Sequence, residues 1–324
     1  MAGSVFTGFA DQVRRASGTP IRIQFGTKPV QDRVEALECR VRVVPVPVPS
    51  DPDPMRFFVL FATVLLAACR IGPAERRAPV TEGVALDRFE IVDLTHALNA
   101  QTIFWPTSPT TFSLDTLSRG HTPGGWFYAA NSFSMPEHGG THLDAPLHFA
   151  EGRHGSDEIP LTKLIGHAVV IDVTSQAGAD PNYRLSAADV LAWEERYGVV
   201  PVNSIVLLRT GWSRHWPDVK AYLGDDTPGD ATRLSFPSFG EDAVQMLVGE
   251  RRIGALGVDV ASIDYGQSTD FMVHRIAADA NVPGLENLTN LARLPATGAM
   301  VIALPVKIEG GTGGPVRVVA LVPR

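Results

Sequence analysis

The sequence has few cysteines, no excess of basic residues and no apolar run long enough to cross a membrane. Cys39 and Cys69 are the only cysteines among 324 residues, and both precede the histidine-rich stretch described below. Neither a disulfide framework nor a cysteine ligand or nucleophile is therefore expected. The formal net charge is −7, and the lack of a basic stripe argues against nucleic acid as a partner. The most apolar run, residues 57–68, is shorter than the roughly 20 residues of a membrane-spanning helix.

The first 54 residues differ in composition from the rest of the chain. Residues 41–54 are rich in alternating proline, which favours extended chain and cannot supply the central strands of a sheet. We expect residues 1–54 to be either a disordered extension or an artefact of the assigned start, with translation beginning at Met55. The alternative is a small N-terminal module followed by a stiff linker.

A targeting segment is expected at residues 55–69. Met55 is followed by Arg56, a short apolar run and then Leu66-Ala-Ala-Cys69, the pattern of a bacterial lipoprotein signal peptide whose cysteine is lipidated. On this hypothesis residues 70–86 are a tether, and the protein is exported and held in the periplasm or at the membrane by the lipid alone. If the apolar run is instead a helix of the core, the protein stays in the cytoplasm.

From residue 87 onward the pattern is that of one folded α/β domain, which we place at residues 87–324. Ser186 and Asp189 form a capping signal for a helix that ends at Gly198. Strands mixed with few helices predict a mixed sheet. Strands are expected at 89–95, 126–135, 168–174, 204–210, 255–264, 299–305 and 316–321, a further helix at 241–251 and a loop at 309–315.

The most informative feature is a cluster of histidines at residues 138–148. His138, His142, Asp144 and His148 fall within this short stretch, separated by small residues. Imidazole and carboxylate are the usual ligands of Zn²⁺, and they also suit Mn²⁺. The cluster therefore predicts a metal site, although a solvated loop is the simpler alternative. The Gly-Gly pair inside it breaks the helix that would place the first two histidines one turn apart, so we expect the ligands on a turn between elements.

The same string resembles a family signature. His138-Gly-Gly-Thr-His-Leu-Asp-Ala-Pro-Leu-His148 matches all seven fixed residues of H-x-G-T-H-x-D-x-P-x-H, which is typical of the cyclase-like metal-dependent hydrolases. These include bacterial kynurenine formamidase and isatin hydrolase. The resemblance runs from about Phe89 to the C-terminus. It implies the swivelling β/β/α fold in one catalytic domain, and a homo-oligomer.

The resemblance also implies a ligand set that extends beyond the cluster. The family has a late histidine and glutamate, and this chain supplies His274 and Glu286. By position, His138, His142 and Asp144 are expected to bind a first metal ion and His274 a second, with Asp144 and Glu286 as bridges. This assignment requires the fold to bring together residues that are far apart in the sequence.

Two further roles follow from the resemblance. His148 matches the proton donor and acceptor, and Trp105 corresponds to a tryptophan that contacts the substrate. Trp126, Phe127 and Phe149 are weaker candidates for the substrate pocket, because aromatic residues beside apolar runs usually belong to the core.

The predicted function is metal-dependent hydrolysis of an amide C–N bond in a small aromatic substrate. One or two Zn²⁺ or Mn²⁺ ions per chain would activate the attacking water. The substrate is expected to be an arylformamide such as N-formylkynurenine or a cyclic amide of the isatin type, and residues 262–271 look closer to the second branch. The alternative is a metal-binding lipoprotein of the same fold without catalysis. The presence of His148 and Glu286 argues against it, because a pure binder needs no proton shuttle.

Overall fold

The chain divides into two compact units, Met1–Thr81 and Glu82–Arg324. The computed structural model describes residues 21–22, 44–45 and 85–324. In the first unit these are two short strands, β1 (Ile21–Arg22) and β2 (Val44–Pro45), which pair antiparallel. The predicted signal segment with Cys69, and the predicted tether up to residue 84, lie outside the described residues. None of the helices in the described part of the chain has the length and apolar character of a membrane span.

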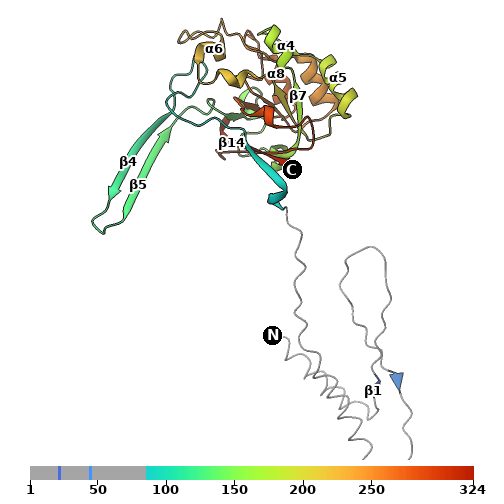
Figure 1. Cartoon of the computed structure of the whole chain (residues 1–324), viewed down its shortest axis with the longest axis horizontal. Helices are drawn as coiled ribbons and strands as arrows, with labels where there is room; N and C mark the ends of the chain where they lie inside the picture. Colours follow the sequence, from blue (N-terminus) through green and yellow to red (C-terminus); the bar gives the residue numbers. More distant parts are fainter. Residues whose placement is uncertain (1–20, 23–43, 46–84) are drawn as a thin grey trace, which may run out of the picture. The chain divides into compact units, whose positions relative to one another are not determined.

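A mixed eight-stranded sheet forms the centre of the second unit (Figure 1). The strands in spatial order are β13 (Met300–Pro305), β7 (Ile165–Asp172), β9 (Ile205–Arg209), β11 (Ala255–Val258), β12 (Gly284–Glu286), β6 (His142–Asp144), β14 (Gly313–Pro323) and β3 (Phe89–Asp93). In this order, the neighbouring strands from β7 to β12 run parallel and the other pairs run antiparallel. Because β14 also pairs with β13, the hydrogen-bonded pairing closes on itself. The predicted mixed sheet is therefore confirmed.

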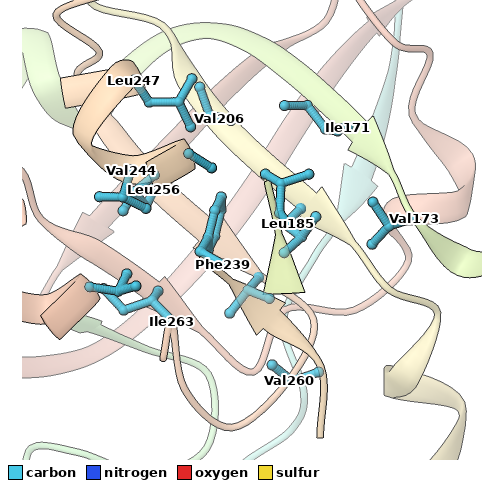
Figure 2. Packing of buried hydrophobic residues seen from close by; sticks show 14 of the residues in the cluster. Ile171, Val173, Leu185, Val206, Phe239, Val244, Leu247, Leu256, Val260 and Ile263 are labelled. Atoms are coloured by element: carbon cyan, nitrogen blue, oxygen red, sulfur yellow. The ribbon is translucent and has the colours of Figure 1, made fainter. Parts of the chain in front are cut away.

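Two hydrophobic cores lie on opposite faces of this sheet. Along β9, Val206 and Leu208 belong to one core and Ile205 and Leu207 to the other, because successive side chains of a strand point to opposite faces. A strand buried on both faces needs a continuous apolar run, as its sequence indicated. Figure 2 shows the first core, in which side chains of the sheet pack against the helical segment that carries Val244.

The helices cover the sheet and are mostly short. The predicted helix that ends at Gly198 is α5 (Ala187–Tyr197). Its capping box is formed as expected, since the side chains of Ser186 and Asp189 each accept a hydrogen bond from the other residue's backbone N–H. The predicted helix at 241–251 is α7, which continues as a π-helical turn, Met246–Glu250. The α-helices are α3 (Leu161–Leu164), α4 (Thr174–Ala179), α5 (Ala187–Tyr197), α6 (Val219–Leu223), α7 (Glu241–Gln245) and α8 (Met272–Asp279). Short 3₁₀ turns occur at Leu86–Arg88, Pro146–His148, Trp212–His215 and Leu291–Arg293, and β8 (Arg184–Leu185) pairs with β10 (Ser238–Phe239).

A two-stranded hairpin projects from the body of this unit (Figure 1). It consists of β4 (Ser113–His121) and β5 (Phe127–Ser134), which pair antiparallel with an irregularity between Thr116 and Ser118. The predicted strand at 126–135 is thus present, whereas its partner β4 was not predicted. Nearly all residues of both strands are exposed. The hairpin is therefore a ribbon with two solvent-facing sides and not part of the central sheet.

The expected loop at 309–315 is shorter in the structure. Gly313, Gly314 and Pro315 already belong to β14 and pair with β6. The expectation was wrong for these residues because glycine favours a loop only in the absence of a pairing partner, and β6 provides one at this position. As a result, the start of β14 lies directly beside the candidate metal ligands.

Candidate metal centre

Three elements that are distant in the sequence carry the predicted metal ligands. Strand β6 carries His142 and Asp144, β12 ends with Glu286, and α8 carries His274. The antiparallel register of β6 and β12 places Glu286 directly opposite His142. Because residues i and i+2 of a strand share a face, these side chains point the same way. Of the ligands predicted to lie on a turn, only His138 lies outside a strand, since His142 and Asp144 lie on a strand paired on both sides.

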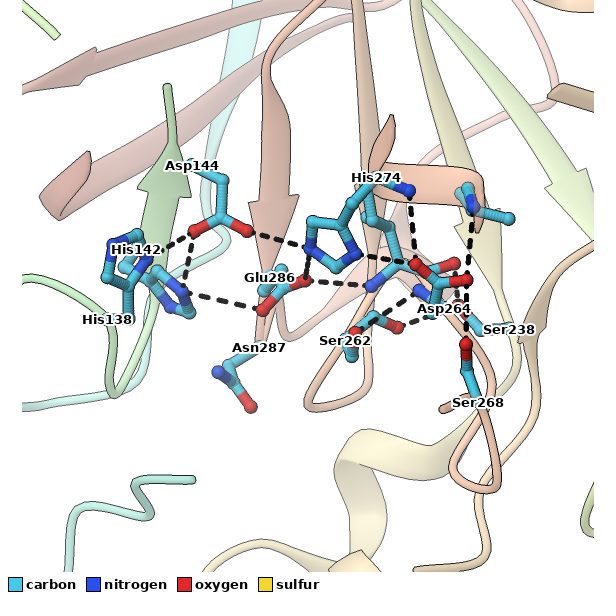
Figure 3. A network of polar contacts seen from close by, with 12 residues as sticks. His138, His142, Asp144, Ser238, Ser262, Asp264, Ser268, His274, Glu286 and Asn287 are labelled. Carbon is cyan, nitrogen blue, oxygen red and sulfur yellow. Dashed lines mark hydrogen bonds and ion pairs between the residues drawn. The ribbon is translucent and has the colours of Figure 1, made fainter. Parts of the chain in front are cut away.

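The ligand atoms converge on the Asp144 carboxylate (Figure 3). The Nδ1 atom of His138 lies 2.6 Å and the Nε2 atom of His142 3.1 Å from Oδ1 of Asp144. The Nε2 atom of His274 lies 3.0 Å from Oδ2 of Asp144 and 3.2 Å from Oε1 of Glu286. Two groups result, His138–His142–Asp144 and Asp144–His274–Glu286, and within each the ligand atoms lie within 4.8 Å of one another. The two groups share Asp144, as the resemblance implied for a pair of ions.

The site is buried and rich in negative charge. Asp144 and Glu286 are each only 5% exposed, and within residues 85–324 neither forms an ion pair with a lysine or arginine. Burial by itself lowers the pKa of His142, but the charges of Asp144 and Glu286 outweigh this effect and raise that pKa to about 9. Burial raises the pKa of Asp144, and its histidine neighbours more than reverse the effect, so that this pKa lies well below its usual range. The carboxylates thus attract positive charge to the imidazole nitrogens, where protons and metal ions compete.

A third carboxylate, outside the two ligand groups, orients the His274 imidazole through its Nδ1 atom. Asp264 accepts a hydrogen bond from the His274 Nδ1 atom at 2.7 Å and from the backbone N–H groups of Val273 and His274 at 3.1 Å. Its contact with the imidazole and these N–H bonds hold the pKa of Asp264 below its usual range despite burial, which alone raises it. Because Nδ1 faces a carboxylate, Nε2 is the nitrogen presented to the site. Asp264 thus bonds to both the start of α8 and the imidazole.

His138 is oriented by residues that the sequence did not single out. Its Nε2 atom lies 2.9 Å from the Thr312 hydroxyl, which donates a hydrogen bond to Glu137. Because the hydroxyl hydrogen is directed to Glu137, Thr312 accepts from His138, and Nδ1 is the nitrogen left to face Asp144. Thr312 precedes β14, so its role depends on the long-range pairing of β14 with β6.

A cavity of about 350 Å³ opens above the ligands. Trp105, Phe149 and Phe271 line it together with the ligand side chains, and the substrate contact expected of Trp105 stays a prediction. The expectation was wrong for Trp126 and Phe127, which lie on the projecting hairpin with 62% and 57% of their surface exposed and do not line the cavity. A cavity of this size with aromatic walls suits a small planar ligand.

His148 lies beside the ligand groups and belongs to neither of them. It ends the 3₁₀ turn after β6, lines the cavity and stacks on His138 with ring centroids 3.8 Å apart. Burial, with a smaller contribution from the neighbouring histidines, lowers the pKa of His148 to about 4. Its imidazole therefore faces the cavity next to the candidate metal ligands without being one of them.

The comparison with known proteins agrees with this geometry. Residues 92–265, more than half of the chain, match the family described as "Putative cyclase". The chain belongs to this cyclase family. It is 36% identical over 208 residues to the isatin hydrolase of Roseibium aggregatum, covering 62% of this chain and 77% of that protein. It is 26% identical over 234 residues to the kynurenine formamidase of Salinibacter ruber, covering 71% and 96%.

The solved structures agree on the fold. A crystal structure of an isatin hydrolase bound to the product analogue thioisatinate superposes with a TM-score of 0.67 at 29% identity, covering 84% of this chain and 100% of that one. The predicted family and cyclase-like α/β fold are confirmed. The chain is thus an enzyme of the metal-dependent amidohydrolase type.

Proposed function

We propose that this enzyme hydrolyses the amide C–N bond of a small cyclic aromatic amide of the isatin type. The observation that carries the proposal is the convergence of two ligand groups on Asp144 beneath an aromatic-walled cavity. The higher identity to an isatin hydrolase than to a kynurenine formamidase, 36% against 26%, favours the cyclic substrate over an arylformamide. Trp105 and Phe271, whose ring centroids lie 6.4 Å apart, would hold the aromatic ring.

The donor set fits a divalent cation. His138, His142, Asp144, His274 and Glu286 would hold one or two Zn²⁺ or Mn²⁺ ions, since imidazole nitrogens and carboxylate oxygens suit both metals. Within residues 85–324, Asp144 and Glu286 have no lysine or arginine partner, so their negative charge can offset that of such ions. A bound cation of this kind supplies Lewis acidity, which polarises a carbonyl group and acidifies water.

His148 is the proposed proton carrier. Its imidazole lines the cavity next to the ligands, where it can take the proton of the attacking water and return it to the leaving nitrogen. The atoms balance in this scheme: water adds to the carbonyl carbon, the C–N bond breaks, and the products are a carboxylate and an amine. For a cyclic amide both groups remain on one molecule.

A substrate screen tests the proposal. Purified protein with Zn²⁺ or Mn²⁺ is assayed on isatin, N-formylkynurenine and simple lactams and lactones, and we expect the highest kcat/KM for isatin-type rings. The His148→Ala variant should bind metal with unchanged stoichiometry and lose about 10²- to 10⁴-fold in kcat. Full activity of this variant would remove His148 from the mechanism. Metal binding by the wild-type chain with no turnover of any compound would favour the non-catalytic binding protein.

We further propose that the enzyme is exported as a lipoprotein and reaches the membrane only through lipid on Cys69. The support is the sequence Leu66-Ala-Ala-Cys69 after a short apolar run. Mass spectrometry of the native protein should detect a diacylglycerol-modified Cys69 as the first residue. Peptides from residues 1–54 in the same sample would contradict both the export hypothesis and the start at Met55.

A further inference from the structure

The backbone carbonyl of Gly140 receives two hydrogen bonds at the edge of the metal centre. The His142 Nδ1 atom lies 3.0 Å and the Asn287 Nδ2 atom 2.8 Å from this oxygen. Gly140 adopts a left-handed conformation with φ of 60°, and its N–H donates to the Ile103 carbonyl. A β-carbon at this position would lie 2.8 Å from the Leu98 side chain. The carbonyl is therefore held in one direction by the backbone and by its neighbours.

The hydrogen bond from His142 to this carbonyl fixes which His142 nitrogen faces the ligand group. A carbonyl oxygen can only accept, so Nδ1 of His142 must carry a hydrogen. The other nitrogen, Nε2, faces Asp144 and Glu286, 3.1 and 3.4 Å away, and is the atom that a cation would bind in place of a proton. The Gly140 carbonyl is thus the partner that decides which nitrogen His142 presents to the ligand group.

Asn287 connects this carbonyl to a buried tyrosine. Its Oδ1 atom accepts a hydrogen bond from the Tyr222 hydroxyl at 2.9 Å. The amide orientation follows from its partners, because the Gly140 carbonyl requires a donor and the Tyr222 hydroxyl supplies one. Tyr222 is fully buried and Asn287 is 3% exposed. Burial, followed by the charges of Asp259 and Glu286, raises the pKa of Tyr222 well above its usual range, so the hydroxyl keeps its proton.

Asn287 also joins the two strands that carry the ligands. It directly follows Glu286 and adopts a left-handed φ of 55°. Its carbonyl accepts a hydrogen bond from the Thr141 hydroxyl at 2.6 Å, and its N–H donates to the Val260 carbonyl. One residue therefore binds both Gly140 and Thr141, the two residues before His142. This placement couples the positions of two ligands on different strands.

We propose that Asn287 and Tyr222 are positioning residues that act through the Gly140 carbonyl to aim the His142 imidazole at the cation. The inference rests on the proposed metal binding and adds a function for two residues outside the ligand set. Tyr222 does not line the cavity, and its hydroxyl donates a hydrogen bond to Asn287, which links it to the Gly140 carbonyl. If the two residues served packing alone, their loss would lower the stability of the fold and leave the affinity for the cation unchanged.

The first variant is Tyr222→Phe in the full chain, which removes only the hydroxyl. Its control is Tyr183→Phe, because the Tyr183 hydroxyl donates to Asp189 outside the site at 2.8 Å. Zn²⁺ affinity is measured by competition with a chelating dye, without substrate, and Co²⁺ is added to read ligand geometry from its visible spectrum. Loss of a residue that orients a metal ligand typically lowers metal affinity roughly 10- to 100-fold. We expect Tyr222→Phe to lower Zn²⁺ affinity by about 10-fold, the lower end of that range, and to alter the Co²⁺ spectrum. Tyr183→Phe should change neither.

The second variant, Asn287→Asp, removes the donor to Gly140 but keeps an acceptor for Tyr222. Aspartate tolerates the left-handed backbone of this position. An added negative charge would by itself tighten cation binding, so weaker binding reports the lost hydrogen bond. Unchanged or tighter Zn²⁺ binding in both variants, with a Co²⁺ spectrum like that of the wild type, would overturn the inference. If the wild-type chain binds Zn²⁺ but hydrolyses none of the screened amides, the proposed function fails while this inference is still decided by the variants.

Discussion

The first ligands of the metal centre follow the β4–β5 hairpin directly in the chain. The two regions depart in opposite directions from the rule that apolar side chains are buried and charged side chains are exposed. The centre buries charged and polar side chains, including those of His142 and Asp144. The hairpin exposes six large apolar side chains, namely Leu114, Leu117, Trp126, Phe127, Tyr128 and Phe133. Neither arrangement stabilises an isolated chain, because burying charge and exposing apolar surface both cost free energy. The proposed cation accounts for the first departure, and we predict that contact with a second copy of the chain accounts for the second.

The largest loss of metal affinity is expected when the carboxylate that both ligand groups share is removed. In Asp144→Asn, three imidazoles lose their common anionic partner. We expect Zn²⁺ affinity to fall by more than the roughly 100-fold upper range for indirect partners, and hydrolysis to become undetectable. The matched control is Asp115→Asn on the hairpin, an exposed aspartate that contacts Ser113. Equal affinities in the two variants, measured by dye competition, would refute the placement of Asp144 in the site.

The sequence predicted the two regions unequally. The histidine cluster was visible because four potential ligands lie close together, and the family resemblance supplied His274 and Glu286. The partners that orient these ligands were not visible, since Asn287 and Thr312 bind residues more than 140 positions away and neither residue type indicates a metal site. Asp264 is the last residue of the strand predicted at 255–264, but its contact with His274 depends on where α8 begins.

The hairpin shows that a strand-like sequence pattern does not predict which sheet the strand joins. Residues 126–135 have the composition of a strand, and β5 forms there. Membership of a sheet, however, depends on the partner strand, and the pairing with β4 spans a turn that the sequence pattern did not indicate. Apolar side chains in a predicted strand suggested burial, whereas Trp126 and Phe127 are exposed. The pattern of apolar residues therefore predicted that a strand forms at residues 127–134, but not that its side chains face solvent.

A smaller loss of Zn²⁺ affinity is expected when the Asp264 carboxylate, which bonds to the His274 Nδ1 atom, is replaced. Asp264→Asn replaces a charged acceptor of the His274 Nδ1 hydrogen by a neutral one. Because charge-assisted bonds to metal-binding imidazoles orient the ring and raise its basicity, Zn²⁺ affinity should fall about 10- to 100-fold with the fold retained. The control is Asp172→Asn, which disrupts the partly exposed ion pair with Arg209 and should change metal affinity little. Loss of affinity in both variants would indicate a general destabilisation instead.

The smallest effect on the metal centre is expected from the hairpin. We predict that its apolar surface contacts a second copy of the chain, because an isolated two-stranded ribbon is only marginally stable in water. The double variant Trp126→Ser and Phe127→Ser should lower the molar mass measured by light scattering after size-exclusion chromatography, while Zn²⁺ affinity stays within error of the wild type. Val199→Ser, which removes an equally exposed apolar side chain from the body, should leave the mass unchanged. A wild-type monomer, or an oligomer that persists in the double variant, would show that the hairpin has another role. A change in Zn²⁺ affinity would instead show that the two regions are coupled, since the hairpin ends only a few residues before His138.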